Sequence, residues 1–143
     1  MEFHSILIPV SGKDSDEESV ELACRLAKAS PGAHLVAVHI IPVDRSLPLD
    51  AEVSSEISRA EKLLAAVEVQ AQKLGCGLET DLLQAREVAP AIVDEAVERK
   101  ADVIILGLSY KTRFGEFCLG QVAPYVLQNA PCRVILYHQR QAI

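Results

Sequence analysis

Residues 103–137 read VIILGLSYKTRFGEFCLGQVAPYVLQNAPCRVILY, and this stretch decides the fold. An aliphatic run typical of a buried strand ends at Gly107, and a mixed basic and polar loop follows. Gly120 then opens the helical segment QVAPYVLQN, which leads into a closing strand, RVILY. Glycine permits a sharp turn, and a helix start exposes free N–H groups. The two glycines therefore predict a frame that holds phosphate, with ordinary tight turns as the alternative.

The composition favours one layered α/β domain over residues 1–143. This length supports one sizeable core and is short for two. Half of the residues are apolar, aromatics make up only 4% and Trp is absent, so the core must consist of Val, Ile, Leu and Ala. Parallel strands buried on both faces have this composition. The formal charge of −6 argues against a nucleic-acid partner.

Targeting signals and metal motifs are missing from the sequence. No apolar run reaches the roughly 18–20 residues of a membrane span, and the N-terminus MEFHSILIPV lacks the positive charge of an export signal. We therefore expect a cytoplasmic protein without direct membrane insertion. The chain has four cysteines, at Cys24, Cys76, Cys118 and Cys132. They form no CxxC pair and are interpreted as unreactive thiols, with a reactive Cys118 as the alternative. No Cys/His cluster has metal spacing, so no metal site is expected.

Aliphatic runs alternate with helical periodicities along the whole chain. Strands are expected at 5–10, 34–41, 77–84, 103–106 and 133–137, and helices at 15–30, 53–74, 88–100 and 121–129. Ser15 and Glu18 match a capping box for the first helix, and Gly75 suits the end of the second. This alternation predicts a parallel sheet with right-handed crossovers and helices on both faces. Ligands of such sheets bind beyond the carboxyl ends of the strands, where we expect the Ser11 and Gly107 loops to meet.

Four segments, ILIPVSGKD, ACRLAKAS, VAVHII and LGQVAPYVLQNAPCRVILY, resemble the universal stress protein family. The resemblance covers essentially the whole chain and implies a single doubly wound α/β domain. Its five-stranded parallel sheet would have the order 3-2-1-4-5. Family members also occur as cytosolic domains of membrane transporters, which makes a transporter a candidate partner or fusion.

The last expected strand, Arg133–Tyr137, would lie at an edge of this sheet. An apolar edge is a hazard unless another strand pairs with it, and only a short polar tail follows in the sequence. Pairing with the same strand of a second copy satisfies both edges about a two-fold axis. The sequence therefore predicts a homodimer through this strand, and the family resemblance implies the same contact.

ATP-binding members of the family carry the pattern G-x2-G-x9-G-[ST] after the fourth strand and an Asp at the end of the first. Gly107 and Gly120 occupy the outer glycine positions with the spacing intact. The middle glycine is replaced by Tyr110, the Ser/Thr by Gln121 and the Asp by Ser11. These changes bring a ring toward the phosphate, remove a hydroxyl and remove a charge. We therefore predict that ATP binds weakly or outside the family's usual pose.

Cations in the expected loops favour a phosphorylated ligand. Lys13, Arg86, Lys111 and Arg113 all follow carboxyl ends of strands. Converging cations at helix starts attract an anion. In the alternative interpretation they are solvated charges paired with neighbouring acidic residues. We expect an adenine nucleotide or a related phosphate between the Ser11–Lys13 turn and Gly120, with Arg86 or Arg113 close by. The expected binding residues are Pro9, Val10, Ser11, Gly12, Lys13, Ile40, Arg86, Gly107, Tyr110, Lys111, Arg113, Gly120, Gln121 and Val122.

No catalytic constellation stands out in the sequence. His39 falls within an expected strand, where a structural role is favoured over a metal role. The sequence therefore predicts a non-enzymatic stress-response module that senses a nucleotide or a related phosphorylated ligand. The alternative is a dimeric interaction or scaffold module whose pocket has decayed, and an enzyme ranks last.

Overall fold

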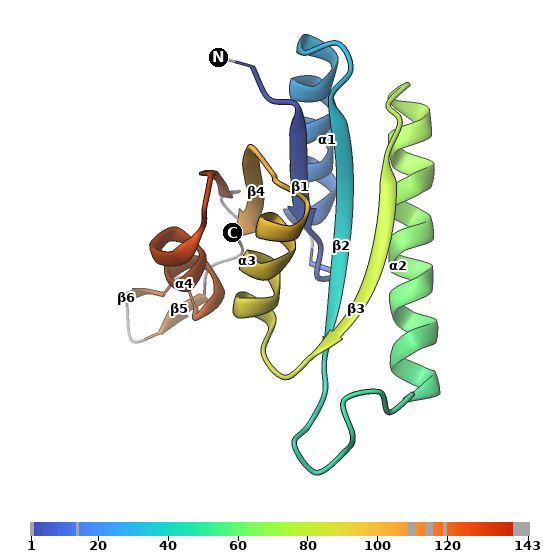
Figure 1. Cartoon of the computed structure of the whole chain (residues 1–143), viewed down its shortest axis with the longest axis vertical. Helices are drawn as coiled ribbons and strands as arrows, with labels where there is room; N and C mark the ends of the chain where they lie inside the picture. The colour runs from blue at the N-terminus through green and yellow to red at the C-terminus, as the bar shows by residue number, and fades with distance from the viewer. Residues whose placement is uncertain (1, 14, 109–110, 114–115, 119, 139–143) are drawn as a thin grey trace.

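A computed structural model describes residues 2–13, 15–108, 111–113, 116–118 and 120–138, with the backbone alone described for 111–113 and 116–118. Its main sheet has five parallel strands in the order β3-β2-β1-β4-β7 (Figure 1). The strands are β1 (Ser5–Pro9), β2 (His34–Pro42), β3 (Glu79–Ala85), β4 (Val103–Leu108) and β7 (Arg133–His138). In chain order these are strands one to five of the main sheet, so the predicted order 3-2-1-4-5 is confirmed.

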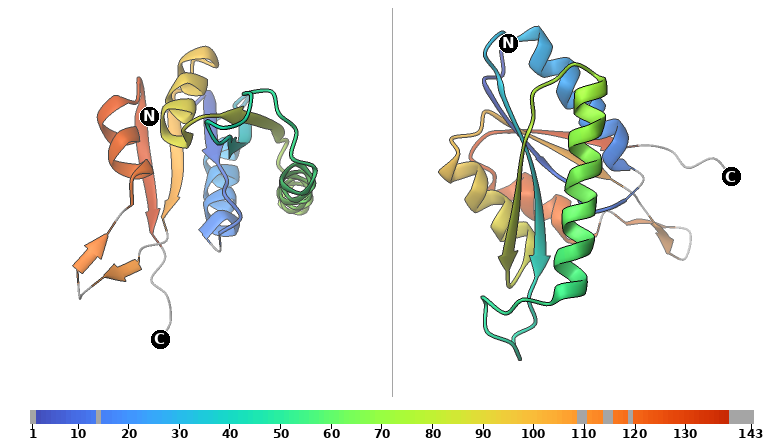
Figure 2. Two further views of the ribbon diagram at one scale, coloured as in Figure 1. Left: turned by 90° about the horizontal axis from the view of Figure 1, so that it is seen from below. Right: turned by 90° about the vertical axis from the view of Figure 1, so that its right-hand side faces the viewer.

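Helices cover both faces of this sheet (Figures 1 and 2). They are α1 (Ser15–Ala29), α2 (Ser54–Lys73), α3 (Val88–Glu98) and α4 (Val122–Asn129). Apolar side chains of α1 and α2 pack with one set of strand residues, and those of α3 and α4 pack with the other set. The predicted doubly wound arrangement is confirmed. None of the helices in the described part of the chain is long and apolar enough to cross a membrane.

The central strands carry the core because both of their faces are covered. Ile8 and Ile104 are 0% exposed, and Leu7, which pairs with Ile104 in the sheet, is 1% exposed. Burying side chains of this size contributes roughly 1.5–3 kcal/mol each. Beyond the end of β1 the Val10 N–H still donates to the Val38 carbonyl oxygen at 2.9 Å. The end of β1 is therefore held firmly against β2.

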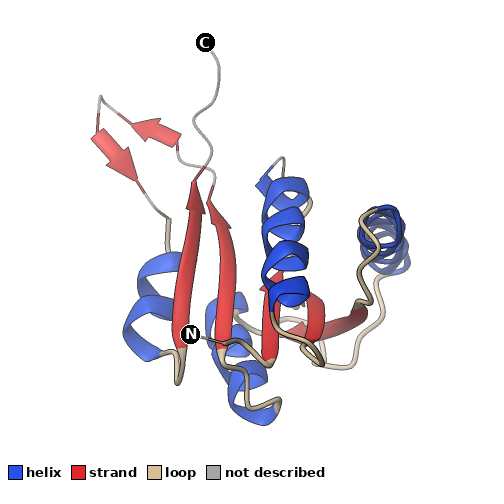
Figure 3. Ribbon diagram, turned by 90° about the horizontal axis from the view of Figure 1, so that it is seen from above, coloured by secondary structure: helices blue, strands red, loops and turns tan. Residues whose placement is uncertain are grey.

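A small antiparallel ribbon replaces part of the loop expected after the fourth strand. β5 (Lys111–Arg113) pairs with β6 (Glu116–Cys118). Figure 3 shows this ribbon standing apart from the main sheet. This ribbon was not predicted, because strands of only three residues are too short to show a periodic pattern. The main sheet itself stays fully parallel.

The two predicted helix signals have different outcomes. Gly75 adopts a φ of 69° and its N–H donates to the Gln72 carbonyl, which confirms it as the end of α2. The capping box at Ser15 is wrong. Ser15 lies inside α1, and its buried hydroxyl makes no hydrogen bond within the described residues.

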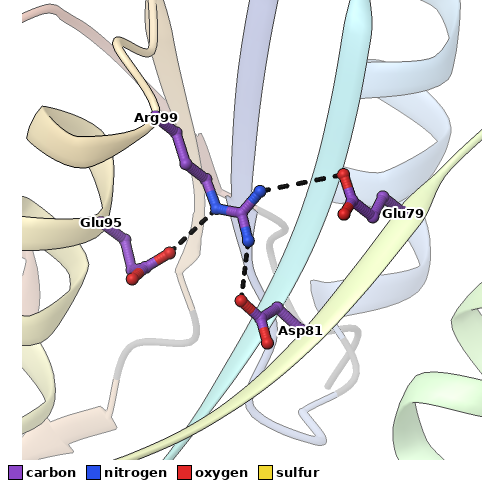
Figure 4. Close-up of polar contacts among 4 residues, drawn as sticks. All are labelled: Glu79, Asp81, Glu95 and Arg99. Carbon is purple, nitrogen blue, oxygen red and sulfur yellow. Dashed lines mark hydrogen bonds and ion pairs between the residues drawn. The ribbon is translucent and has the colours of Figure 1, made fainter.

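Arg99 fastens the end of α3 to the edge strand β3 (Figure 4). Its guanidinium donates to Glu95 at 2.9 Å and to Asp81 at 2.7 Å, and it lies 3.8 Å from Glu79. Hydrogen bonding to Glu95 raises the pKa of Arg99, outweighing burial, and Asp81 adds to the rise. This cluster lies at the amino end of β3, away from the carboxyl ends of the strands.

Candidate functional site

A cavity of about 340 Å³ opens at the carboxyl ends of β1, β2 and β4. The starts of α3 and α4 form its other walls. The position is the one that an open parallel sheet reserves for ligands, where neighbouring crossovers leave in opposite directions. The lining residues are Pro9, Val10, Ser11, Lys13, Val38, His39, Ile40, Pro42, Val88, Ile92, Leu106, Gly107, Leu108, Gly120, Gln121, Val122 and Ala123.

Most of the residues predicted from the sequence meet around this cavity. Those that line it are Pro9, Val10, Ser11, Lys13, Ile40, Gly107, Gly120, Gln121 and Val122. Gly12 lies beside it and lines two hollows next to α2 instead. Tyr110 falls outside the described residues, and so do the side chains of Lys111 and Arg113. Binding by any of these residues stays a prediction.

Arg86 does not line the cavity, contrary to its expected place beside the ligand. Its Nη1 atom donates to the carbonyl oxygens of Asp44 at 2.7 Å and Leu47 at 2.8 Å. A longer contact of 3.4 Å reaches the Val43 carbonyl. Arg86 therefore holds the loop between β2 and α2, whose carbonyl groups satisfy this part of the guanidinium.

A carboxylate from the first turn of α1 binds the backbone of the loop after β1. The Asp16 carboxylate accepts the N–H of Gly12 at 2.6 Å and the N–H of Ser11 at 3.1 Å. Asp16 is only 8% exposed, and burial raises the pKa of its carboxyl although the backbone N–H groups act in the opposite direction. These two amides are thus already paired. This role of Asp16 was not predicted from the sequence, where it is simply an acidic residue in the first turn of a helix.

Gly107 is required by packing between α1 and β4. A Cβ atom at this position would lie 3.0 Å from the Ser15 Oγ and 3.3 Å from the Ser15 carbonyl oxygen. Gly107 therefore lets the start of α1 approach β4 closely, whatever else borders it. Close packing inside β4, rather than the tight turn predicted as the alternative, explains Gly107 without a ligand.

The start of α4 differs from the loop after β1. Gly120 has a φ of 74°, which favours glycine, and Gln121 is the N-cap but makes no side-chain capping bond. The first N–H groups of a helix have no partner within the helix. Gly120, Gln121, Val122 and Ala123 all line the cavity. The positive end of α4 therefore borders the cavity, and no carboxylate is among the described residues that line it.

His39 joins β2 to the end of β1 and also borders the cavity. Its Nδ1 lies 2.7 Å from the Val10 carbonyl oxygen. A carbonyl oxygen can only accept, so Nδ1 carries the proton and Nε2 of the neutral ring is an acceptor. The predicted structural role fits this contact. Its place in the cavity wall was not predicted, although its neighbour Ile40 was predicted there.

The apolar part of the cavity was also not foreseen. Val88 and Ile92 stand one turn apart on α3 and face Val38 and Leu106 from the sheet. Helical periodicity over 88–100 predicts a helix, but it does not distinguish a core residue from one that lines a cavity. Within the described residues, no group of three potential ligands could hold a metal ion.

A doubly wound parallel sheet with a cavity at its carboxyl edge defines the Rossmann-like class of α/β protein, in which ligands bind at that edge. The family model described as the universal stress protein family matches residues 2–138. A universal stress protein of Methanocaldococcus jannaschii is 32% identical over 142 residues, covering 94% of this chain and 81% of that protein. One of Thermus aquaticus is 32% identical over 139 residues, with 94% and 98% covered. This chain belongs to the universal stress protein family.

A solved structure extends the comparison to a bound ligand. The universal stress protein from Archaeoglobus fulgidus in complex with dAMP is 28% identical to this chain. The match has a TM-score of 0.74 and covers 95% of this chain and 98% of that one. The likeness therefore extends over nearly the entire fold.

Proposed function

We propose that this chain is a non-catalytic regulatory module that binds an adenine nucleotide in the cavity between β1, β2, β4 and the start of α4. The observation that carries the proposal is a largely apolar cavity bordered by the start of α4, whose N-cap residue Gln121 makes no side-chain capping bond. An apolar slot suits a base, and free helix N–H groups suit a phosphate. The dAMP complex of the Archaeoglobus relative supports the same class of ligand.

The lining suggests how the ligand would be oriented. Val38, Ile40, Val88 and Ile92 supply the apolar surface for the base. Gly120 and Gln121 supply the donor end for phosphate, with the exposed Lys13 as a cation on the other side. The amides of Ser11 and Gly12 do not take part in this arrangement, because Asp16 already accepts from them. The phosphate is therefore assigned to α4.

A binding role is favoured over catalysis by the chemistry of the lining. Among the described lining residues there is no carboxylate, and His39 uses Nδ1 to hold the Val10 carbonyl. Hydrolysis of a nucleotide needs a group that orients water. These residues suit recognition of a ligand rather than its conversion.

A scaffold role in a homodimer is the second candidate, favoured by the edge strand β7. Among the described strands β7 pairs with β4 alone. Val134, Ile135 and Leu136 are only half-buried on it. Tyr125 and Leu127 of the neighbouring α4 are 38% and 50% exposed. Pairing of two β7 strands would cover this edge. A transporter partner rests on the family resemblance alone.

The discriminating experiment is mass spectrometry of small molecules released from denatured purified protein, followed by thermal unfolding with added AMP, dAMP and adenosine. The sensing role predicts a released adenine nucleotide or a midpoint raised by AMP. No released nucleotide and no shift with any of the three would favour the scaffold role. Sedimentation at micromolar concentration then tests the homodimer, and a monomer would contradict it.

A further inference from the structure

Two of the cysteines meet in the core on the face covered by α1 and α2. Cys24 of α1 is 1% exposed, whereas Cys76, just beyond the end of α2, is half-buried and packs against the same apolar cluster. The Cys76 thiol is close enough to Cys24 to contribute to its raised pKa, and it also contacts the Gly77 carbonyl oxygen at 3.8 Å. The long stretch of chain between them conceals this pair in the sequence, where the thiols were interpreted as unreactive.

Backbone contacts fix the position of Cys76 independently of its side chain. Its N–H donates to the Ala71 carbonyl at 2.9 Å, which closes the last turn of α2. One turn beyond Cys24 on α1, the Lys28 ammonium donates to the Leu74 carbonyl. The face of α1 that carries Cys24 and Lys28 is thus held against the end of α2. Backbone contacts of the folded state therefore place Cys24 and Cys76 on facing segments.

We propose that Cys24 and Cys76 form a peroxide-responsive modification site, in which hydrogen peroxide converts the two neighbouring thiols into a disulfide. Peroxide reaches the half-buried Cys76 first, giving a sulfenic acid and one water. The Cys24 sulfur then attacks the Cys76 sulfur, the S–O bond breaks, and the hydroxyl leaves with the Cys24 proton as a second water. The two thiols lose two electrons in total, and the peroxide gains them.

The electrostatics of the pair assign these roles. Burial, followed by the hydrogen bond and charge of Cys76, raises the pKa of Cys24 to about 12. Cys24 is therefore a protonated thiol that does not initiate the reaction. Cys76 is the more exposed of the two thiols, so it is the reacting one and Cys24 is the resolving one.

The experiment uses the full chain in a Cys118→Ser/Cys132→Ala background, so that only the pair remains. After peroxide treatment, peptide mapping without reductant should find the Cys24 and Cys76 peptides joined, with the loss of two hydrogen atoms. Closing a loop of about 50 residues should raise the thermal midpoint by on the order of 10 °C, and dithiothreitol should reverse the rise.

Cys76→Ser in the same background is the matched control, and it should show neither the link nor the rise. Because Cys24 is buried, Cys24→Ala is used beside Cys24→Ser to separate loss of folding from loss of the link. Sulfinic acid at Cys76 with Cys24 still reduced would overturn the proposal. Links between chains in place of the internal disulfide would overturn it as well.

Discussion

The loop after β1 and the start of α4 border the same cavity but differ in the partners of their backbone N–H groups. After β1, the N–H groups of Ser11 and Gly12 donate to the chain's own Asp16 carboxylate. At α4, the N-cap Gln121 makes no side-chain bond to the helix start. Two loops that each have a glycine at positive φ therefore differ in that one is capped by a described side chain, Asp16, whereas the N-cap side chain of the other makes no such bond.

This difference shows why glycine spacing alone does not locate a phosphate. A turn glycine establishes where the backbone bends, but the partner of the neighbouring N–H groups decides whether a ligand can bind there. In this molecule an internal carboxylate occupies one turn. The ligand site that we propose is therefore one-sided, with α4 as its anion-binding end.

The largest expected effect is on Gly107, the residue that brings α1 against β4. Gly107→Ala should lower the free energy of unfolding by about 2–3 kcal/mol, because its Cβ would press on the Ser15 side chain and carbonyl. Urea unfolding measures this loss. Ser15→Ala alone should be neutral or stabilising, since it removes a buried hydroxyl without a hydrogen-bond partner. The double variant should lose less than Gly107→Ala. A variant that loses nucleotide affinity at full stability would return Gly107 to a phosphate-binding role.

Removing the Asp16 carboxylate tests its role in the loop after β1. Asp16→Ala should cost about 1.5 kcal/mol of unfolding free energy, because the Ser11 and Gly12 N–H groups lose their acceptor. Asp16→Asn retains one acceptor oxygen and should cost less. Chemical denaturation of the three proteins gives the order. Equal stability of Asp16→Ala and the unaltered chain would show that water replaces the carboxylate without loss.

Placing an anion on the open side is the converse test. Gln121→Glu keeps the size of the side chain and adds a negative charge at the start of α4. We expect AMP affinity to fall about tenfold, or ~1.4 kcal/mol, while adenosine affinity is unchanged. Isothermal titration measures both ligands. Equal losses for AMP and adenosine would mean that Gln121 contacts the nucleoside, and the phosphate would have to be placed elsewhere.

The smallest expected effect is the pH dependence of Asp16. Burial raises its pKa in the folded state, so the folded protein holds the proton to a higher pH than an unfolded Asp with a pKa of about 3.9. As pH rises between these two pKa values, the unaltered chain should lose stability relative to Asp16→Asn. Above the folded pKa the difference should be constant. If the unaltered chain instead gains stability relative to Asp16→Asn as pH rises, the pKa of Asp16 is lowered in the folded state.

The fold was predictable because its signals are local and agree with one another. Aliphatic strands such as β1 and β4 alternate with amphipathic helices, and this pattern fixes a parallel sheet with covered faces. Gly75 likewise predicts the end of α2, where it adopts a positive φ. The β5–β6 ribbon escaped prediction because its strands are too short to show a period.

The site was predictable only in its backbone positions. Ser11, Ile40 and Gly120 follow from the rule that strand ends meet at one edge of the sheet. Side-chain partners did not follow from that rule. Arg86 reaches the carbonyls of a neighbouring loop, and Asp16 turns back onto the amides before it. Both contacts depend on how loops fold over one another, which spacing along the chain does not encode.

We propose that the start of α4 binds the phosphate of an adenine nucleotide, and the most direct test is the ratio of AMP to adenosine affinity for the unaltered chain. Isothermal titration at one salt concentration measures both affinities. We expect AMP to bind at least about tenfold more tightly, since a charge-assisted contact with helix N–H groups is worth ~1.4 kcal/mol or more. Equal affinities, or no binding of either compound, would contradict it.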